Sequence, residues 1–295
     1  MRRIDFLINK VRFNTNNLTP NRFNDLDLAV YFNDGQRHMQ NAIIQSNPRH
    51  EIFSQELEMA LEAGKESYDL PADIFATSAI NFVDIRSSTS SDRWYPAKSL
   101  INPERRRGSG YIIRGNQIIF SPIPNGNNIG AARLIYVKKL HDVGPRFGSV
   151  SSTTSNSIIF SSLQSAGLKV SDYYDYLSVV DKYGVFKSEK IEIGGESVVG
   201  SQHTITTTSD LSNVFNTDYI VGGERTTTQS EFPDVCELFL TSLVERMVQG
   251  VDSSEDLSAS SALTAEERTA ITELFKDVPQ DPPYPPIVSD EYLNI

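Results

Sequence analysis

The stretch Ser67-Tyr68-Asp69-Leu70-Pro71 marks the point where the hydrophobic period of this sequence changes. Before it, apolar residues recur every three or four positions, which is typical of amphipathic helices. After it, apolar and polar residues alternate, which is typical of half-buried strands. The stretch itself predicts a short strand that runs into a turn at Pro71. The fold is therefore expected to combine helical and β segments.

Helices are expected on the N-terminal side of this stretch. After a first helix that contains Ile4, a second helix begins at Asn24, a good N-cap residue, and runs to about Gln45. Because Gly35 interrupts it, either this helix bends or another backbone comes close to it. Residues 51–63 form a third helical candidate. The first helix carries its apolar residues at helical spacing on one face: Ile4, Leu7, Ile8 and Val11.

Strand candidates follow in two groups. The first contains an alternating run at 80–85, a hairpin of 111–113 and 117–120, and a second alternating run at 133–138. The second lies in a Ser/Thr-rich stretch from about Gly148 to Ser230, where glycines separate six short runs. Such spacing suggests a small β-sandwich or barrel inserted as a module. The six runs are 158–160, 176–180, 190–193, 197–199, 204–208 and 219–221.

Helical spacing returns at Pro233 and continues to Gly250, with Cys236 on the face expected to be buried. Thr264-Ala265-Glu266-Glu267 is a capping-box signature that opens a last helix. Five prolines between residues 279 and 286 then force an extended, polyproline-like tail.

The predicted fold class is therefore α+β: a helical bundle formed from the N- and C-terminal helices, with inserted β-rich segments and an extended C-terminal tail. Neither group of end helices can bury its apolar face alone, so the two groups are expected to pack together. The expected divisions are 1–66 for the N-terminal helices, 67–147 for a β extension, 148–230 for the inserted β-sandwich or barrel-like module, 231–276 for the C-terminal helices and 277–295 for the tail.

The composition excludes several classes of protein. A net charge of −11 at a pI near 4.9 excludes general electrostatic binding to nucleic acid or to an anionic membrane. No run of apolar residues is long enough to span a bilayer, and the start has no signal-peptide pattern, so a soluble protein made in the cytoplasm is expected. A single cysteine excludes an intrachain disulfide framework and a multi-cysteine metal site.

Residue patterns for catalysis are missing from the sequence. No two of the four histidines have the spacing of a zinc pair. Glu56 and Glu58 lie two residues apart on a candidate helix, where they would point in different directions. No phosphate-binding loop or nucleophile motif follows a strand. The expectation is therefore a protein without catalytic residues, metal or cofactor, and not an enzyme.

The run Arg105-Arg106-Arg107 is the strongest basic feature of this acidic chain. It would suit an interface with another protein, a contact with DNA phosphates supported by stacking on the nearby Trp94 and Tyr95, or simply a solvated loop. Three arginines are few for the electrostatic affinity that nucleic-acid binding requires. The sequence leaves these three interpretations open.

The C-terminal tail is suited to lie along another protein, because a proline-rich segment loses little entropy on ordering. Strand addition and groove docking are both compatible with its apolar end. A disordered terminus is the alternative. The residues that favour docking are Tyr284, Ile287, Val288, Tyr292, Leu293 and Ile295.

Several segments, taken in order, resemble the head-to-tail adaptor, or connector, proteins of short-tailed bacteriophages. The likeness covers residues 1 to about 140 and 230–295, whereas 148–230 departs from the shorter members. The similar segments are the first helix, Tyr31-Phe32-Asn33-Asp34-Gly35-Gln36 with the rest of 31–40, Tyr68-Asp69-Leu70-Pro71 with 72–75, residues 104–107, the hairpin at 111–122, Phe232-Pro233-Asp234, Asp252-Ser253-Ser254 and 263–267.

The resemblance implies a structural virion protein at the head–tail junction that forms a twelve-fold ring. Such a ring joins the portal protein to the tail nozzle or hub, and its channel lets double-stranded DNA pass without specific binding. The C-terminal segment is then expected to dock on the portal. The role of 148–230 stays open between bracing neighbouring subunits, contacting the nozzle and holding fibres.

Two other functions compete with this prediction. One is a receptor- or glycan-binding virion protein, a trimer or monomer whose 148–230 module binds sugar through exposed aromatic side chains. The other, weaker one is a hydrolase, which would need an acid/base pair that the spacing does not reveal.

Overall fold

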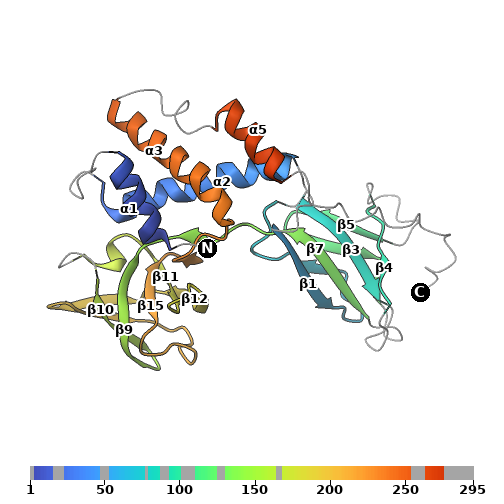
Figure 1. Ribbon diagram of the computed structural model, residues 1–295. Coiled ribbons are helices and arrows are strands. Elements are labelled where there is room, and N and C mark those ends of the chain that lie inside the picture. The colour runs from blue at the N-terminus through green and yellow to red at the C-terminus, as the bar shows by residue number, and fades with distance from the viewer. Residues whose placement is uncertain are drawn as a thin grey trace. The chain divides into compact units, whose positions relative to one another are not determined.

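The computed structural model describes residues 3–15, 23–46, 53–76, 79–86, 93–100, 110–124, 130–163, 168–253 and 263–275. The chain divides into two compact units (Figure 1). Unit 1 comprises Met1–Asn41 and His141–Arg268, and unit 2 comprises Ala42–Leu140 and Thr269–Ile295. Each unit is therefore built from two separate stretches of the chain.

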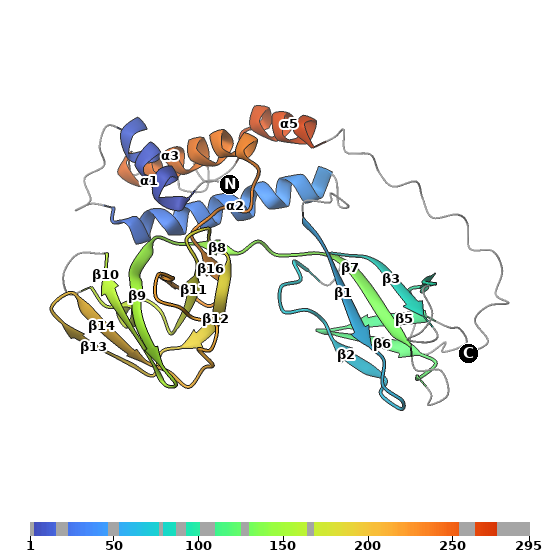
Figure 2. The ribbon, with the colours of Figure 1, turned by 60° about the horizontal axis from the view of Figure 1, so that its bottom comes forward.

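The helices are α1 (Ile4–Asn14), α2 (Asp25–Ser46), α3 (Glu237–Ser253) and α5 (Ala265–Leu274). Within unit 1, α1 packs along α3 (Figures 1 and 2). The four apolar residues expected on one face of α1 are all buried. None of the helices in the described ranges is long and apolar enough to cross a membrane.

Two helix starts form the reciprocal capping that the sequence suggests. The Asp27 amide donates to Asn24 Oδ1 at 2.8 Å, and the Asn24 amide donates to Asp27 Oδ2 at 2.9 Å. Thr264 and Glu267 exchange the same two bonds at the start of α5, at 3.2 and 2.9 Å. These bonds satisfy backbone donors that a helix leaves unpaired, so the predicted starts at both caps are confirmed.

Unit 1 contains a seven-stranded antiparallel sheet of order β12-β11-β15-β9-β10-β14-β13. Two-residue turns join β9 to β10 and β13 to β14, the second with Gly200 at a φ of 65°. The strands are β9 (Arg146–Thr154), β10 (Ser157–Ser162), β11 (Tyr176–Val180), β12 (Phe186–Glu192), β13 (Gly195–Val199), β14 (Gln202–Thr206) and β15 (Tyr219–Gly222). A short 3-10 helix, η3 (Val170–Asp172), precedes β11.

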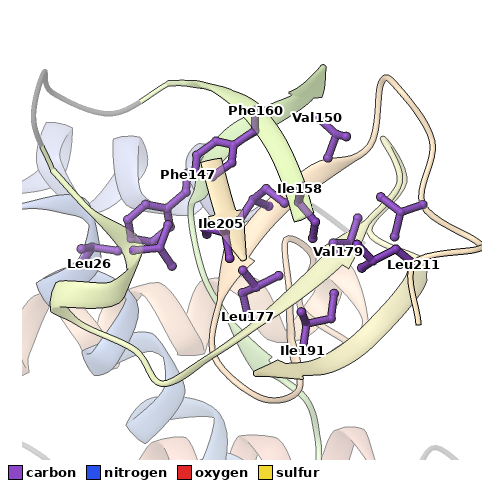
Figure 3. Close-up of a cluster of buried hydrophobic side chains, with 13 residues drawn as sticks. Leu26, Phe147, Val150, Ile158, Phe160, Leu177, Val179, Ile191, Ile205 and Leu211 are labelled. Carbon is purple, nitrogen blue, oxygen red and sulfur yellow. The ribbon is translucent and has the colours of Figure 1, made fainter. Parts of the chain in front are cut away.

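One face of this sheet makes the core of unit 1 (Figure 3). Strands throughout the sheet contribute to a single cluster, which Leu26 from the start of α2 joins. Residues outside the strands, Val170, Leu211 and Val214, complete the cluster. The strand residues of the cluster are Phe147, Val150, Ile158, Phe160, Leu177, Val179, Ile191, Ile205 and Ile220.

A short parallel pair lies beside the helices of unit 1. It consists of β8 (Asp142–Val143) and β16 (Thr226–Thr227), with Thr226 opposite Asp142. Asn33 of α2 bonds to both backbone groups of Val143, at 2.7 and 3.1 Å. These two bonds attach β8, at the start of the stretch His141–Arg268, to α2. A second 3-10 helix, η4 (Asp234–Cys236), leads into α3.

Unit 2 is a sandwich of two small antiparallel sheets. The first has the order β1-β7-β3-β4, and the second has the order β2-β6-β5. The strands are β1 (Ser54–Ala60), β7 (Ala131–Val137), β3 (Ile80–Arg86), β4 (Tyr95–Pro96), β2 (Ser67–Asp69), β6 (Gln117–Ser121) and β5 (Gly110–Arg114). Both sheets contribute to one core, for example through Leu134 and Val83 on one side and Tyr68, Ile118 and Phe120 on the other.

The predicted fold class is wrong. Strands dominate the described residues, and antiparallel sheets, not a helical bundle with inserted β segments, form the cores of both units. The N- and C-terminal helices do meet, since α1 packs on α3, but they line a β-rich unit. The five-part division of the chain stays a prediction.

One element prediction fails for a clear physical reason. Residues 51–63 were expected to form a helix, yet Ser54–Ala60 is strand β1, paired with β7 from Ser54 opposite Val137 to Ala60 opposite Ala131. Glu, Leu, Met and Ala favour helices by only tenths of a kcal/mol, about 0–0.7 per residue, so pairing and burial of Leu57 and Met59 outweigh that preference.

Candidate functional site

The residues singled out from the sequence for binding lie outside the described residues. This holds for Arg105, Arg106 and Arg107, and for Tyr284, Ile287, Val288, Tyr292, Leu293 and Ile295. Their roles stay predictions. Candidate sites must therefore be built from the side chains that the structure does place.

The outer face of the first sheet of unit 2 carries a ladder of charges. Glu58, Arg133 and Asp84 are directly opposite one another on β1, β7 and β3. Arg133 donates to Asp84 Oδ2 from Nη2 at 2.6 Å and from Nε at 3.2 Å, and its Nη1 lies 3.7 Å from Glu56 Oε1. Arg86 pairs with Glu58. The ladder thus links all three strands by charge.

Trp94 covers this ladder from the segment before β4. The guanidinium carbons of Arg86 and Arg133 each lie 4.8 Å from the centroid of its ring. Cation–π contact of this kind contributes about 0.5–1 kcal/mol at partly exposed sites. The one tryptophan of the chain therefore has two arginine partners. Tyr95 beside it is 41% exposed.

The sequence reasoning about Glu56 and Glu58 was also wrong. Two residues apart on a helix they would diverge, but on strand β1 they lie on the same face of the sheet. Both face arginines, so they act as ion-pair partners between strands. The signal for this arrangement was the alternation in Asp84-Ile85-Arg86, which places two opposite charges on one face of β3.

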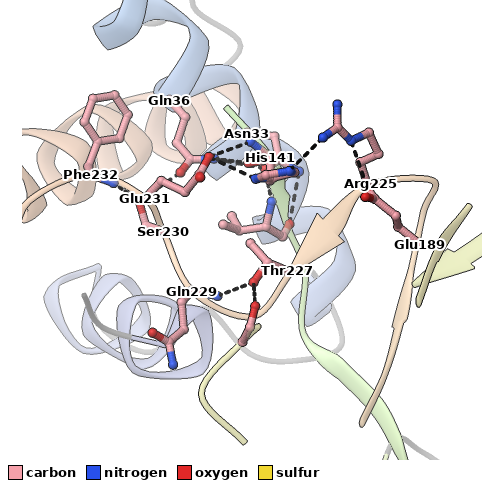
Figure 4. A network of polar contacts seen from close by, with 12 residues as sticks. Asn33, Gln36, His141, Glu189, Arg225, Thr227, Gln229, Ser230, Glu231 and Phe232 are labelled. Atoms are coloured by element: carbon pink, nitrogen blue, oxygen red, sulfur yellow. Dashed lines mark hydrogen bonds and ion pairs between the residues drawn. The ribbon is translucent and has the colours of Figure 1, made fainter. Parts of the chain in front are cut away.

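A second polar network lies in unit 1, around His141 (Figure 4). The His141 amide donates to Glu231 Oε2 at 2.9 Å, and its carbonyl accepts from Gln36 Nε2 at 3.5 Å. Gln36 in turn accepts from Ser230 Oγ at 2.9 Å. Gln36 and Ser230 are 2% and 3% exposed, so these buried polar groups are satisfied by one another. The network joins α2 to the two chain segments that bear β8 and β16.

A buried acid–base pair lies in the sheet of unit 1. His203 Nδ1 is 2.5 Å from Glu196 Oε1, and Glu196 Oε2 accepts from the Ser171 amide of η3 at 2.9 Å. The imidazole stacks on Phe160 with ring centroids 4.9 Å apart. Glu196 therefore fastens η3 to the sheet through its carboxylate.

Cys236 and the remaining histidines give no site among the described residues. Cys236 is fully buried, and burial raises the pKa of its thiol to about 12, which disfavours the thiolate needed for nucleophilic attack. His38 is exposed on α2, and His50 lies outside the described ranges. In the part of the chain that the structure describes, no cluster of three or more His, Cys, Asp or Glu is arranged to hold a metal ion.

An apolar face is exposed on α1. Phe6 and Phe13 are 48% and 80% exposed, although Ile4 and Leu7 on the other side of the helix are fully buried. Residues seven apart lie on the same helix face, so the two rings share one outer surface. Asn9 and Lys10 lie between the two rings on this side of α1, so the surface combines aromatic with polar side chains.

The described residues thus form two β-rich units with structural ion pairs between strands and exposed phenylalanine side chains on α1. Residues 4–158, which are 155 of the 295 residues, match the family model of the SU10 adaptor protein. The chain therefore belongs to the SU10 adaptor protein family. No curated protein matches the chain.

Family membership confirms the resemblance to phage head-to-tail adaptors and makes the chain a structural protein of a phage virion. The match begins at Ile4 and covers α1, α2, the whole stretch Ala42–Leu140 of unit 2, and the chain as far as the start of β10. The likeness noted for residues 230–295 lies outside this match and stays a prediction.

Proposed function

We propose that this protein forms a homo-oligomeric ring at the head–tail junction, which joins the portal to the tail nozzle or hub and continues the channel for double-stranded DNA. The observation that carries the proposal is the family match over residues 4–158. An adaptor of this kind works by holding partners in register, so the proposal includes no catalytic activity. A twelve-fold ring is the expected assembly.

A closed ring requires each copy to present two different, complementary surfaces. The outer face of α1, with Phe6 and Phe13, supports one of them. This face lies within the residues that match the family. We assign it to the contact with the neighbouring copy, because burying the largely exposed ring of Phe13 contributes about 1.5–3 kcal/mol.

The acidic net charge of the chain supports a role as a channel for DNA. With 38 acidic against 27 basic residues, a lumen lined by this protein repels the duplex and does not retain it during passage. The tail residues 284–295 are assigned to docking on the portal, and Arg105, Arg106 and Arg107 to a contact with a neighbouring protein or with the DNA backbone.

Imaging of the purified protein mixed with the portal tests the proposal. We expect a ring of adaptor copies on the portal, which Phe13→Glu disperses and deletion of residues 279–295 releases. Val199→Glu is the matched control, since Val199 is 78% exposed but lies outside the family match. A ring unaffected by Phe13→Glu would exclude the α1 face, and no ring at all would exclude the proposed assembly.

The glycan-binding alternative has one observation in its favour. Tyr173, Tyr183 and Phe215, all within the 148–230 segment, are 51%, 64% and 60% exposed. A trimer or monomer that binds cell-surface sugar and ignores the portal would favour this second function over the first.

A further inference from the structure

The imidazole of His141 lies between two groups of opposite charge, all within unit 1 (Figure 4). Its Nδ1 is 3.1 Å from Glu231 Oε2, and its Nε2 is 3.2 Å from Arg225 Nη2. A guanidinium group can only donate hydrogen bonds, so Nε2 must accept one. The geometry therefore selects the neutral ring with its proton on Nδ1, donated to Glu231.

Other groups around the ring complete its environment. The ring of Phe186 on β12 packs against the imidazole, with centroids 4.8 Å apart. Arg225 also donates from Nε to Glu189 Oε2, at 2.9 Å. Solvent reaches the site, since the side chains of His141 and Glu231 are 17% and 20% exposed.

Charged groups beyond the ring are already paired with one another. Asp142 follows His141 in the chain, and its Oδ1 lies 3.1 Å from Nη2 of Arg37 on α2. The Nη1 atom of Arg37 lies 3.2 Å from Asp34 Oδ1. Tyr174 lies close enough to Asp142 for that carboxylate to contribute, after burial, to raising the pKa of its phenol. The groups that contact the imidazole nitrogens themselves are therefore Glu231 and Arg225.

We propose that His141 is a pH-sensitive switch that exchanges its partners. A proton taken from solvent onto Nε2 turns this acceptor into a donor, so that an N–H faces the N–H of Arg225 and two positive charges meet. The bond from Nδ1 to Glu231 then joins two full charges and strengthens. Protonation thus breaks the bond between Arg225 and His141 Nε2, while Arg225 keeps its bond to Glu189. The bond between His141 Nδ1 and Glu231 becomes stronger.

The switch acts at the start of a short strand pair. Arg225 directly precedes β16 and His141 directly precedes β8, and the two strands pair in parallel over only two residues each. Releasing Arg225 removes one of the contacts at this end, where the Lys190 amide also donates to the Glu224 carbonyl at 2.8 Å and the Thr226 amide to Ser178 Oγ at 3.3 Å. The start of β16 is then held by fewer contacts. Glu231 still binds the His141 amide, so the start of β8 keeps its place.

Two double-mutant cycles test the switch in the full chain. One combines His141→Asn with Arg225→Gln, and the other combines His141→Asn with Glu231→Gln, each measured by chemical denaturation at about pH 8 and about pH 5.5. We expect the His141–Arg225 coupling to favour folding about fivefold at the higher pH and to vanish or reverse at the lower one.

The His141–Glu231 coupling should grow at the lower pH, whereas a purely structural role would move both couplings together. His38→Asn, at an exposed histidine of α2, controls for the loss of an imidazole. Couplings that change in the same direction, or that do not change, would overturn the proposal.

Hydrogen exchange of the unaltered chain gives a second measurement that requires no variant to fold. After correction for the intrinsic rates, the amides of 224–228 should lose protection between about pH 8 and about pH 5.5 while those of β9 keep theirs. Equal protection of 224–228 at both pH values would also overturn the switch.

Discussion

Cys236 shows how burial controls the chemistry of a single side chain. Its thiol keeps its proton in the folded state because burial raises its pKa to about 12, whereas an unfolded chain ionises near the ordinary cysteine value of about 8.5. The folded state therefore loses stability relative to the unfolded state as the pH rises above that value. We expect Cys236→Ala to remove this part of the alkaline destabilisation, measured by denaturant midpoints between about pH 7 and about pH 10. An unchanged alkaline slope would contradict the assignment.

The packing at Gly35 also depends on a single residue. The sequence suggested a bend or a nearby backbone, but the close approach comes from a side chain of α3: a Cβ at residue 35 would lie 2.9 Å from Leu240 Cδ1. We expect Gly35→Leu to lower the free energy of unfolding by about 1–3 kcal/mol through overpacking. His38→Leu, at an exposed position of the same helix, should change it by less than about 0.5 kcal/mol. Equal effects of the two substitutions would show that α3 does not pack there.

The charge ladder belongs to the scale of elements, since it joins β1, β7 and β3. Asp84 is 2% exposed and pairs through Oδ2 with Arg133, so Arg133→Met leaves a buried carboxylate without this cation. We expect a loss of about 3–5 kcal/mol in unfolding free energy, most of which a second change, Asp84→Asn, restores. Glu56→Gln should cost less than about 1 kcal/mol, because Glu56 is 55% exposed and 3.7 Å from Arg133. Similar losses for Arg133→Met and Glu56→Gln would refute the burial argument.

Charge acts at the scale of the whole molecule. With a net charge of −11, the protein should not retard duplex DNA in a mobility assay at about 150 mM salt, because phosphate neutralisation supplies most non-specific affinity. Replacing Arg105, Arg106 and Arg107 by alanine should leave this result unchanged. A retarded complex that dissociates as salt is raised would instead assign the arginine run to DNA.

Apart from residues 51–63, local patterns predicted the helices because their determinants lie close together in the chain. The buried face of α1, the caps at Asn24 and Thr264, and the hairpin around Gly115, whose φ is 59°, follow from contacts within a few residues. Each of the six short runs between 158 and 221 overlaps a strand, although residues 193 and 207–208 lie past the ends of β12 and β14. Strand β9 was missed, since its Ser/Thr-rich half has almost no apolar alternation.

The candidate sites were less predictable, because they join residues that are far apart in sequence. The ladder depends on the register of Asp84 with Arg133, and the His141 network joins residues 33–36 with 141 and 225–231. No local pattern contains such a register. Family membership, by contrast, could be recognised from short motifs in the right order, as the match over 4–158 confirms.

The sequence by itself determined the helix starts, most strands, the acidic charge and the kinship with phage adaptors, since each depends on local spacing or composition. Only the tertiary structure decided that 54–60 is a strand, that β-sheets form both cores, and which partners Trp94 and His141 contact. The physical reason is that local preferences differ by tenths of a kcal/mol, whereas pairing a strand and burying its apolar face contribute about 1 kcal/mol or more per residue.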